Sequence, residues 1–175
     1  MDQILEIVKY VVPALVVVLS SWLILRNQSK AEEQKQKEAI ALETHKFMLP
    51  LRLQAYERLS LLLERISPES LLMRHSGSNM LSHQLHTELL SSIRAEYEHN
   101  MSQQIYVTPK VWDAVLLART QTIQIINLSA TAVDATASSF DLSKKIIEHC
   151  ATHSKLPTVV ALETLRTEVG TEFKS

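Results

Sequence analysis

The sequence predicts an all-α protein, with an N-terminal transmembrane helix that continues into a stalk helix and then a cytoplasmic antiparallel helical bundle. Three observations favour this fold class. The chain holds only two glycines and five prolines among 175 residues, so residues that break helices are rare. A long apolar run lies near the N-terminus, and apolar residues recur at helical spacing through the rest of the chain.

The apolar run from Ile4 to Leu25 predicts a membrane anchor that contacts the lipid bilayer through residues 4–25. Glu6 and Lys9 are its only charged residues, and as a helix it would span about 33 Å, close to the thickness of a hydrocarbon core. The acidic residues Asp2 and Glu6 lie at the start of the run and no A-x-A cleavage site follows it, which favours a retained anchor over a secretory signal. A buried core helix is disfavoured because the run is long and uniformly apolar.

Basic residues predict the orientation of this anchor. Only Lys9 precedes the centre of the span, whereas Arg26, Lys30, Lys35 and Lys37 follow it. Because basic flanks stay on the cytoplasmic side, we expect a single-pass protein of the bacterial cytoplasmic (inner) membrane with its C-terminal domain in the cytoplasm. The expected division is a membrane anchor at 1–27, a charged stalk helix at 28–49, a helical bundle at 50–170 and a tail at 171–175.

The stalk mixes charges of both signs at helical spacing, which favours a solvated helix over a disordered linker. A heptad repeat of Leu42, Leu49, Tyr56 and Leu63 predicts an oligomer seam. Polar residues interrupt the companion positions, so the repeat fits packing in a bundle better than a free two-stranded coil. Whether the stalk is a true coiled coil stays open.

Prolines and small polar residues predict where the later helices begin and end. Pro50 predicts a kink or a restart, because proline removes a backbone donor inside a helix. The sequence predicts helix starts at Ser67-Pro68 and Thr108-Pro109, where a capping hydroxyl precedes a proline at the first helical position. The other predicted boundaries are a loop at His75 to Asn79, a possible break near Ser138, a boundary at Pro157 and a C-cap at Gly170.

The stretch from Glu96 to Pro109, "EYEHNMSQQIYVTP", predicts a structural polar joint between helices in preference to a ligand or partner contact. Apolar residues recur every fourth position before and through it: Leu81, Leu85, Leu89, Ile93, Tyr97, Met101 and Ile105. On this helical wheel Asn100 and Gln104 lie near the buried stripe and form a structural polar joint, with the backbone of the following turn as partner. Glu96, His99 and Gln103 lie on another face, which is a possible partner-binding face.

The sequence offers little support for catalysis or metal binding, and we expect no enzyme activity and no cofactor. Glu96-x-x-His99 occurs once, whereas di-iron bundles need two copies and two further glutamates. His83-x-x-His86 has no placed third ligand. His149 and Cys150 are adjacent on a helix and point about 100° apart, so they do not form a nucleophile and base pair. A formal charge of −1 gives no sign of nucleic-acid binding.

Two blocks carry a resemblance: "LPLRLQAYERLSLLLERISPESLLMR" from Leu49 to Arg74, and "EYEHNMSQQIYVTPKVWDAV" from Glu96 to Val115. Together with the N-terminal "KYVVPALVVVL", they resemble a family of small bacterial proteins of unknown function with one N-terminal membrane anchor. The resemblance covers most of the chain up to about Val115. It implies the anchor and supplies no activity, cofactor or catalytic residue.

The expected function is therefore a membrane-anchored helical scaffold, adaptor or assembly subunit without catalytic activity of its own. Its expected partners are the bilayer and a second copy of the chain or another membrane-associated protein. The alternative is a regulatory or sensory subunit that couples the membrane anchor to a cytoplasmic partner. A scaffold predicts a constant assembly, whereas a regulator predicts that stalk packing changes when a partner binds.

Overall fold

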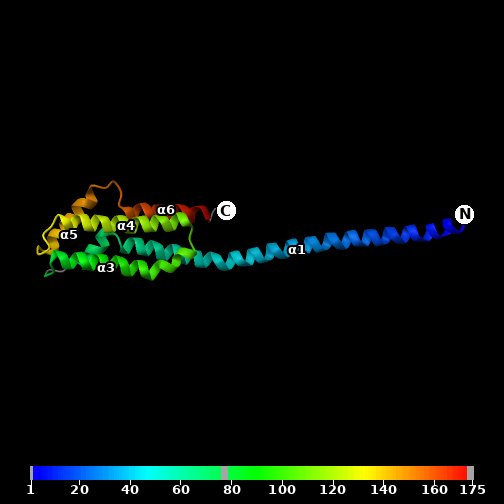
Figure 1. The fold of residues 1–175 in the computed structure, drawn as a ribbon, viewed down its shortest axis with the longest axis horizontal. Coiled ribbons are helices and arrows are strands. Elements are labelled where there is room, and N and C mark those ends of the chain that lie inside the picture. The colour runs from blue at the N-terminus through cyan, green and yellow to red at the C-terminus, as the bar shows by residue number, and fades with distance from the viewer. Residues whose placement is uncertain (1, 76–78, 173–175) are drawn as a thin grey trace. The chain divides into compact units, whose positions relative to one another are not determined.

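A computed structural model describes residues 2–75 and 79–172, without the side chains of residues 2–14, 17, 18, 23, 24, 27, 29–31 and 172. The described residues are all-helical and contain no strand, which confirms the all-α class. The helices are α1 Asp2–Arg65, α2 Pro68–His75, α3 Ser82–Asn100, the 3₁₀ helix η1 Met101–Ile105, α4 Pro109–Thr131, α5 Ser139–Ala151 and α6 Pro157–Glu172 (Figure 1).

The chain divides into two compact units, residues 1–49 and 50–175. Helix α1 belongs to both, and Pro50 lies inside it, so of the predicted kink or restart at this proline the restart is wrong, while the kink stays a prediction. A proline inside a helix costs about 3 kcal/mol. Good helix formers on both sides and the burial of Ala55 and Leu59 in the second unit offset that cost.

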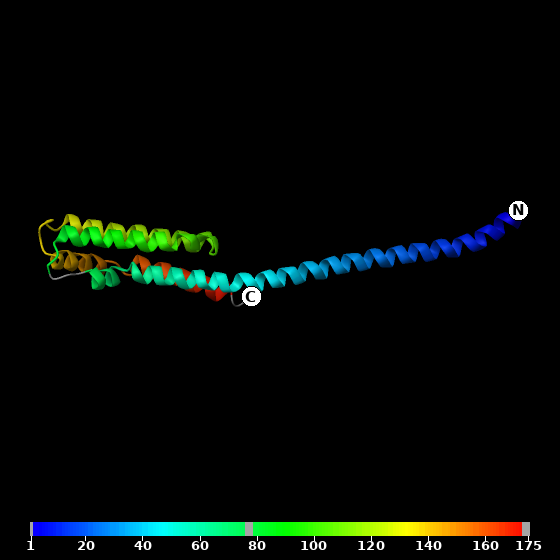
Figure 2. The ribbon, with the colours of Figure 1, turned by 90° about the horizontal axis from the view of Figure 1, so that it is seen from below.

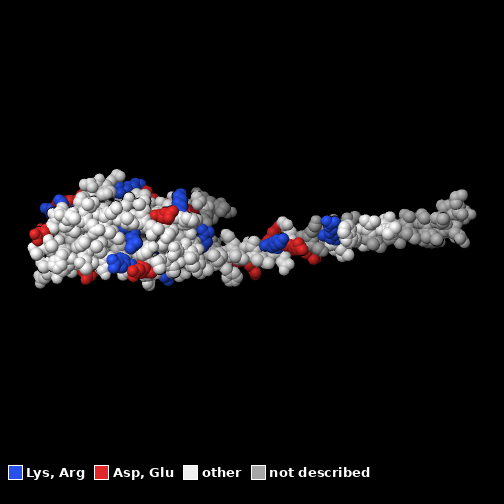
Figure 3. Space-filling view, in the orientation of Figure 1, with Lys and Arg blue, Asp and Glu red and all other residues white. Residues whose placement is uncertain are grey.

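The described side chains of the first unit from Leu15 to Met48 are exposed, and acidic and basic residues mix along its second half (Figure 3). Gln34 Nε2 donates to Glu38 Oε1 at 3.3 Å, one turn further along. Among the residues whose side chains are described, no helix is long and apolar enough to cross a membrane. Most of the predicted span from Ile4 to Leu25 lies outside those residues, so the predicted anchor has no support from the structure.

Helix α4 is central to the second unit, where it packs against α3, α5 and α6. Figures 1 and 2 show α3 beside α4, with α5 and α6 following each other along the length of α4. The core takes fully buried aliphatic side chains from all of these helices and from α1 and α2: Leu59, Leu63, Leu71, Leu85, Leu89, Ile93, Val115, Ile126, Leu142, Ile146 and Leu165. Burial of each contributes about 1.5–3 kcal/mol relative to exposure.

Several predicted helix starts are confirmed by their capping bonds. Ser67 Oγ accepts from the backbone of Ser70 at 3.3 Å, directly before Pro68 begins α2. Thr108 Oγ1 accepts from the backbone of Val111 at 3.4 Å, and Pro109 is the first residue of α4. Each hydroxyl oxygen satisfies a backbone N–H that has no partner inside its helix. The boundary at Pro157 is confirmed by the start of α6.

The helix that begins at Pro109 is broken before Ser138, which settles a point that the sequence left open. Ser138 caps α5: its Oγ accepts from the backbone of Asp141 at 3.3 Å, and its backbone N–H donates to Asp141 Oδ2 at 3.2 Å. The C-cap predicted at Gly170 is wrong, because α6 continues through this residue to Glu172. A C-capping glycine takes a left-handed conformation, and Gly170 does not.

The chain before α3 is tied to the chain before α5 by backbone hydrogen bonds. Ser82 N donates to Ala137 O at 2.8 Å, and Ser139 N donates to Met80 O at 2.9 Å. These bonds flank an isolated antiparallel bridge between Leu81 and Ser138. They fix the starts of α3 and α5 against each other, at one end of the bundle.

Candidate functional site

Glu96 lies on α3, and its carboxylate meets arginines from the two preceding helices. Its Oε1 is 2.7 Å from Arg65 Nε and 3.6 Å from Arg74 Nη1. The Glu96 side chain is only 15% exposed. The reason is tertiary, because the end of α1 and the end of α2 both reach this point of α3. Glu96 therefore joins three helices.

Arg74 also closes the end of α1. Its Nη2 donates to the backbone oxygen of Arg65 at 2.6 Å, and its Nε donates to the backbone oxygen of Ser70 at 3.3 Å. Arg65 is the last residue of α1, where carbonyl groups lack partners inside the helix. A guanidinium at this position also interacts favourably with the helix dipole. This cluster of Glu96, Arg65 and Arg74 holds the α1–α2 turn against α3.

The structure separates the two amides of the predicted polar joint. Asn100 is buried, and its Nδ2 donates to the backbone oxygen of Glu96 at 2.8 Å, within α3 rather than across the following turn. Gln104 is exposed in η1, so its predicted burial is wrong. A 3₁₀ helix has three residues per turn instead of 3.6, which rotates the residues after Asn100 away from the buried stripe. Met101 and Ile105 are exposed for the same reason.

A cavity of about 390 Å³ lies between the second half of α1 and α3. Glu96, His99 and Asn100 line it together with Arg58 and residues of α1 around it. Gln103 does not line the cavity: it is half-buried, and its Nε2 donates to Ser102 Oγ at 3.2 Å. The structure therefore brings together two of the three residues of the predicted partner-binding face. That role stays a prediction for Glu96, His99 and Gln103.

A second polar cluster joins α1, the start of α4 and α6. The Tyr56 hydroxyl donates to Glu168 Oε1 at 2.6 Å, and the Thr108 hydroxyl donates to Glu168 Oε2 at 2.6 Å. Arg52 Nη2 donates to the Tyr56 hydroxyl at 3.4 Å, while its Nε donates to the backbone oxygen of Tyr106 at 3.1 Å. Burial, and after it the hydrogen bond to Glu168, raises the pKa of Tyr56 to about 12. The phenol therefore stays protonated and serves as a donor.

The predicted oligomer seam needs a correction at two of its four residues. Tyr56 and Leu63 are 4% and 0% exposed, because they pack inside the core of their own chain. The heptad spacing there reflects the buried face of α1 and not a surface for a second chain. Leu42 is 58% exposed and Leu49 is half-buried. For these two residues the seam stays a prediction.

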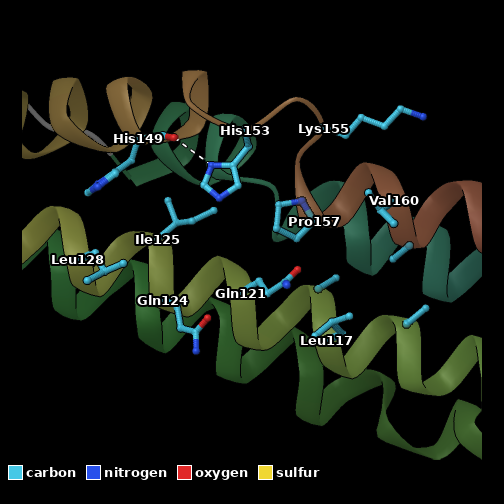
Figure 4. A pocket seen from close by; sticks show the side chains of 13 residues that line it. Leu117, Gln121, Gln124, Ile125, Leu128, His149, His153, Lys155, Pro157 and Val160 are labelled. Carbon is cyan, nitrogen blue, oxygen red and sulfur yellow. Dashed lines mark hydrogen bonds between the residues drawn. The ribbon is translucent and has the colours of Figure 1, made fainter.

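A groove of about 450 Å³ lies between α4 on one side and the end of α5 and the start of α6 on the other. Figure 4 shows Leu117, Gln121, Gln124 and Leu128 following one another along α4, with His153 and Pro157 opposite. Apolar side chains form most of the lining, with amide, imidazole and ammonium groups among them. The Lys155 ammonium at its edge is paired with Glu163 at 2.6 Å. A groove of this composition suits a protein segment better than a small charged substrate.

The two histidines beside this groove are held by Nδ1. His149 Nδ1 lies 2.9 Å from Ser129 Oγ, and His153 Nδ1 lies 3.1 Å from the backbone oxygen of His149. The Ser129 hydroxyl already donates to the backbone oxygen of Ile125 at 2.8 Å, so the His149 ring must donate Nδ1–H to Ser129. Ser129 is also fully buried. Ser129 and His149 therefore have neither the proton arrangement nor the solvent access of a nucleophile and its base.

Other candidate chemical groups also have structural partners. His83 Nδ1 lies 2.9 Å from the backbone oxygen of Ala135, and His86 Nε2 lies 2.8 Å from Asn127 Oδ1, so the two histidines link α3 to different parts of the chain. No group of three or more metal-binding side chains occurs among the described residues. Burial raises the pKa of the Cys150 thiol, which disfavours the reactive thiolate.

The fold and these clusters define an all-helical protein whose second unit carries open grooves between helices. Residues 2–172 match the model of a family described as "Family of unknown function (DUF7935)". The chain belongs to this family, which confirms the resemblance to a family of unknown function. Comparison with curated proteins and comparison with solved structures gave no match.

Proposed function

We propose that the protein is a membrane-anchored helical scaffold or adaptor without catalytic activity of its own. Residues 4–25 would hold it in the bacterial inner membrane, and the bundle would bind its partner in the cytoplasm. The apolar run and the basic residues after it support the anchor and its orientation.

One observation carries the adaptor proposal: the groove along α4 is open and largely apolar, and its amides lie on the exposed face of a helix. Elsewhere in the bundle, the carboxylates of Glu96 and Glu168 are engaged in joining helices. A groove between helices with apolar walls is a common docking site for a partner helix. This division of surfaces suits binding better than catalysis.

The alternative is a regulatory or sensory subunit, and one observation favours it. Helix α1 runs from the first unit into the core of the second, where Leu59 and Leu63 are fully buried. A displacement of the stalk along this helix would reach the packing of the bundle. A regulator predicts that substitutions at residues 28–49 change partner binding by the bundle, whereas a scaffold predicts that binding is unchanged.

The anchor is tested by fractionating bacteria that produce the full chain or a chain that begins at Gln28. We expect the full chain to resist an alkaline wash of the membranes, and the shortened chain to leave them. A reporter enzyme that is active only outside the cytoplasm, fused after Ser175, should stay silent. Release of the full chain by the wash would contradict the anchor, and an active reporter would contradict the orientation.

The adaptor function is tested by chemical crosslinking in the same membranes, followed by purification and mass spectrometry. We expect the full chain to be joined to a defined protein through residues of the α4 groove, in a constant ratio. Crosslinks spread evenly over the bundle would contradict a dedicated docking groove.

A further inference from the structure

Four residues form a regular stripe along the exposed face of α4: Leu117, Gln121, Gln124 and Leu128, which we call the α4 stripe. All four are exposed, and the leucines at its ends are 56% and 58% exposed. Their spacings of four, three and four residues are those of a heptad seam. The stripe is about 16 Å long, roughly three turns of helix. It has the length and periodicity of a helix-packing surface.

Over the length of the stripe this face of α4 has no charged residue, and Asp113 lies one turn before it. From Ala114 to Thr131 the only charged residue is Arg119, in a chain that is 21% charged. The Arg119 guanidinium lies 4.1 Å from the centre of the Tyr97 ring on α3, so it turns to another side of α4. Exposed helix faces normally carry charged residues, whereas the centres of protein interfaces are depleted of them. Figure 3 shows wide uncharged areas on the bundle.

The polar groups of this face fall into two kinds. The hydroxyls of Thr120 and Thr131 donate to backbone oxygens of α4, at 2.9 Å to Leu116 and 2.8 Å to Leu128. For Gln121 and Gln124, the described part of the chain shows no hydrogen bond of either amide. A side-chain amide is both donor and acceptor, so it is complementary to another amide. The stripe thus offers paired donors and acceptors between two leucines.

The order leucine, glutamine, glutamine, leucine reads the same in both directions, and its spacings do so too. We infer that the α4 stripe binds the same stripe on a second copy of this chain, in a two-fold symmetric contact. Leucine then packs on leucine and glutamine bonds glutamine, whether the two α4 helices run parallel or antiparallel. Polar residues at seam positions fix the register of such a contact. The inference rests on the proposed function and names its partner.

The groove beside the stripe gives room for the second helix. Across from Gln121 and Ile125, the opposite wall consists of His153, Pro157 and Val160 (Figure 4). Val160 is exposed and apolar. The stripe itself forms one wall of this groove, so the space beside it is open to a second helix. No carboxylate lines the groove, and Lys155, the charged residue at its edge, is already paired with Glu163.

Cysteine crosslinking of the full chain in bacterial membranes tests this contact. In a Cys150→Ser background, we would compare Leu117→Cys, Leu128→Cys and the variant with both changes, with Ser91→Cys on the exposed face of α3 as control. A disulfide needs Cβ atoms about 4 Å apart, so only facing positions react. A parallel contact gives a dimer with each single variant, an antiparallel contact gives one only with the double variant, and either result supports the inference.

A second substitution separates assembly from folding. Gln124→Arg in the double-cysteine chain should reduce the dimer at least about tenfold, because it buries an unpaired charge at the seam. Ser91→Arg should leave the dimer unchanged. If none of the three leucine-to-cysteine variants, the double variant included, gives a dimer, or if the crosslinked band has the mass of a different protein, the inference is wrong. Membrane fractionation of the same cells shows separately whether the anchor holds, so that failure of the proposed function is distinguishable.

Discussion

The Glu96 cluster and the α4 stripe are two polar surfaces of one bundle with opposite chemistry. Glu96 is charged, mostly buried and paired with Arg65 and Arg74 from two other helices. Gln121 and Gln124 on the stripe are neutral and exposed, and no hydrogen bond of theirs occurs in the described part of the chain. The charged groups of the first surface have their partners within one chain, whereas in our proposal the amides of the second find theirs on another molecule. We therefore use the presence or absence of a partner within the chain to distinguish polar groups that stabilise the fold from those proposed to bind another molecule.

The largest expected effect is on the second cluster of the paired kind, at Glu168. Glu168→Ala leaves the hydroxyls of Tyr56 and Thr108 without their acceptor. Because each unpaired buried group costs about 1–3 kcal/mol, we expect unfolding free energy to fall by roughly 2–4 kcal/mol. Urea unfolding of the full chain in mild detergent, followed by Trp112 fluorescence in a Trp22→Phe background, measures this loss.

Glu163→Ala is the matched control on the same helix, because Glu163 is exposed and pairs with an exposed Lys155. We expect a change of about half a kcal/mol or less. Equal losses for the two glutamates would mean that the Glu168 cluster contributes no more than a surface ion pair.

A pH titration sharpens the same point at Tyr56. Its pKa is raised from 10.0 to about 12 in the folded state. A raised pKa gives stability that is complete below pH 10 and is lost as the pH rises toward 12, on the order of 1–3 kcal/mol in total. We expect the unfolding free energy to fall more steeply over this range for the natural chain than for Tyr56→Phe. Parallel curves for the two proteins would contradict the buried, bonded phenol.

Substitution of Glu96 should have the next largest effect. Glu96→Ala leaves Arg65 and Arg74 without their shared carboxylate. Since Arg65 is half exposed, we expect a loss of only about 1–2 kcal/mol in urea unfolding. Glu98→Ala, at an exposed position of the same helix, should change the unfolding free energy by less than about half a kcal/mol. A larger loss of unfolding free energy for Glu98→Ala than for Glu96→Ala would contradict the stabilising role of the Glu96 ion pairs.

The smallest effects distinguish the two amides after Glu96. Asn100→Ala removes a buried donor that bonds the Glu96 backbone, and we expect a loss of about 1 kcal/mol. Gln104→Ala, at an exposed position of η1, should change stability by less than about half a kcal/mol. The same unfolding assay compares them. A greater loss for Gln104 would show that the 3₁₀ turn does not direct it to solvent.

Local chemistry made much of the fold predictable. Thr108-Pro109 and Ser67-Pro68 define helix starts through contacts within four residues, so sequence alone identifies them. The restart at Pro50 and the C-cap at Gly170 were predicted wrongly, because packing and neighbouring helix formers override the local preference of one residue. Gln104 was wrongly predicted to lie near the buried stripe, because the helical wheel assumed that α3 continues. In the structure, η1 replaces α3 after Asn100.

The sites were less predictable, since they depend on contacts between distant residues. Tyr56 and Glu168 are 112 residues apart, and no spacing rule connects them. The arginines that bind Glu96 come from helices that precede the α2–α3 loop, so the wheel of α3 alone could not place them. The α4 stripe left a visible signal, which is the near absence of charge from Ala114 to Thr131. The low charge favours a binding surface only because that face of α4 is exposed, which the sequence alone does not show.

One paired measurement tests most directly the claim that the two surfaces have separate tasks. We would measure two quantities for the natural chain, Gln124→Arg and Glu96→Ala. The first is the mass of the protein in detergent particles, from light scattering during chromatography. The second is the unfolding free energy at high dilution. We predict that Gln124→Arg halves the protein mass and changes unfolding by less than about half a kcal/mol. Glu96→Ala should keep the mass and lose about 1–2 kcal/mol. A monomeric natural chain, or a Gln124→Arg variant that unfolds without a change in mass, would contradict the account.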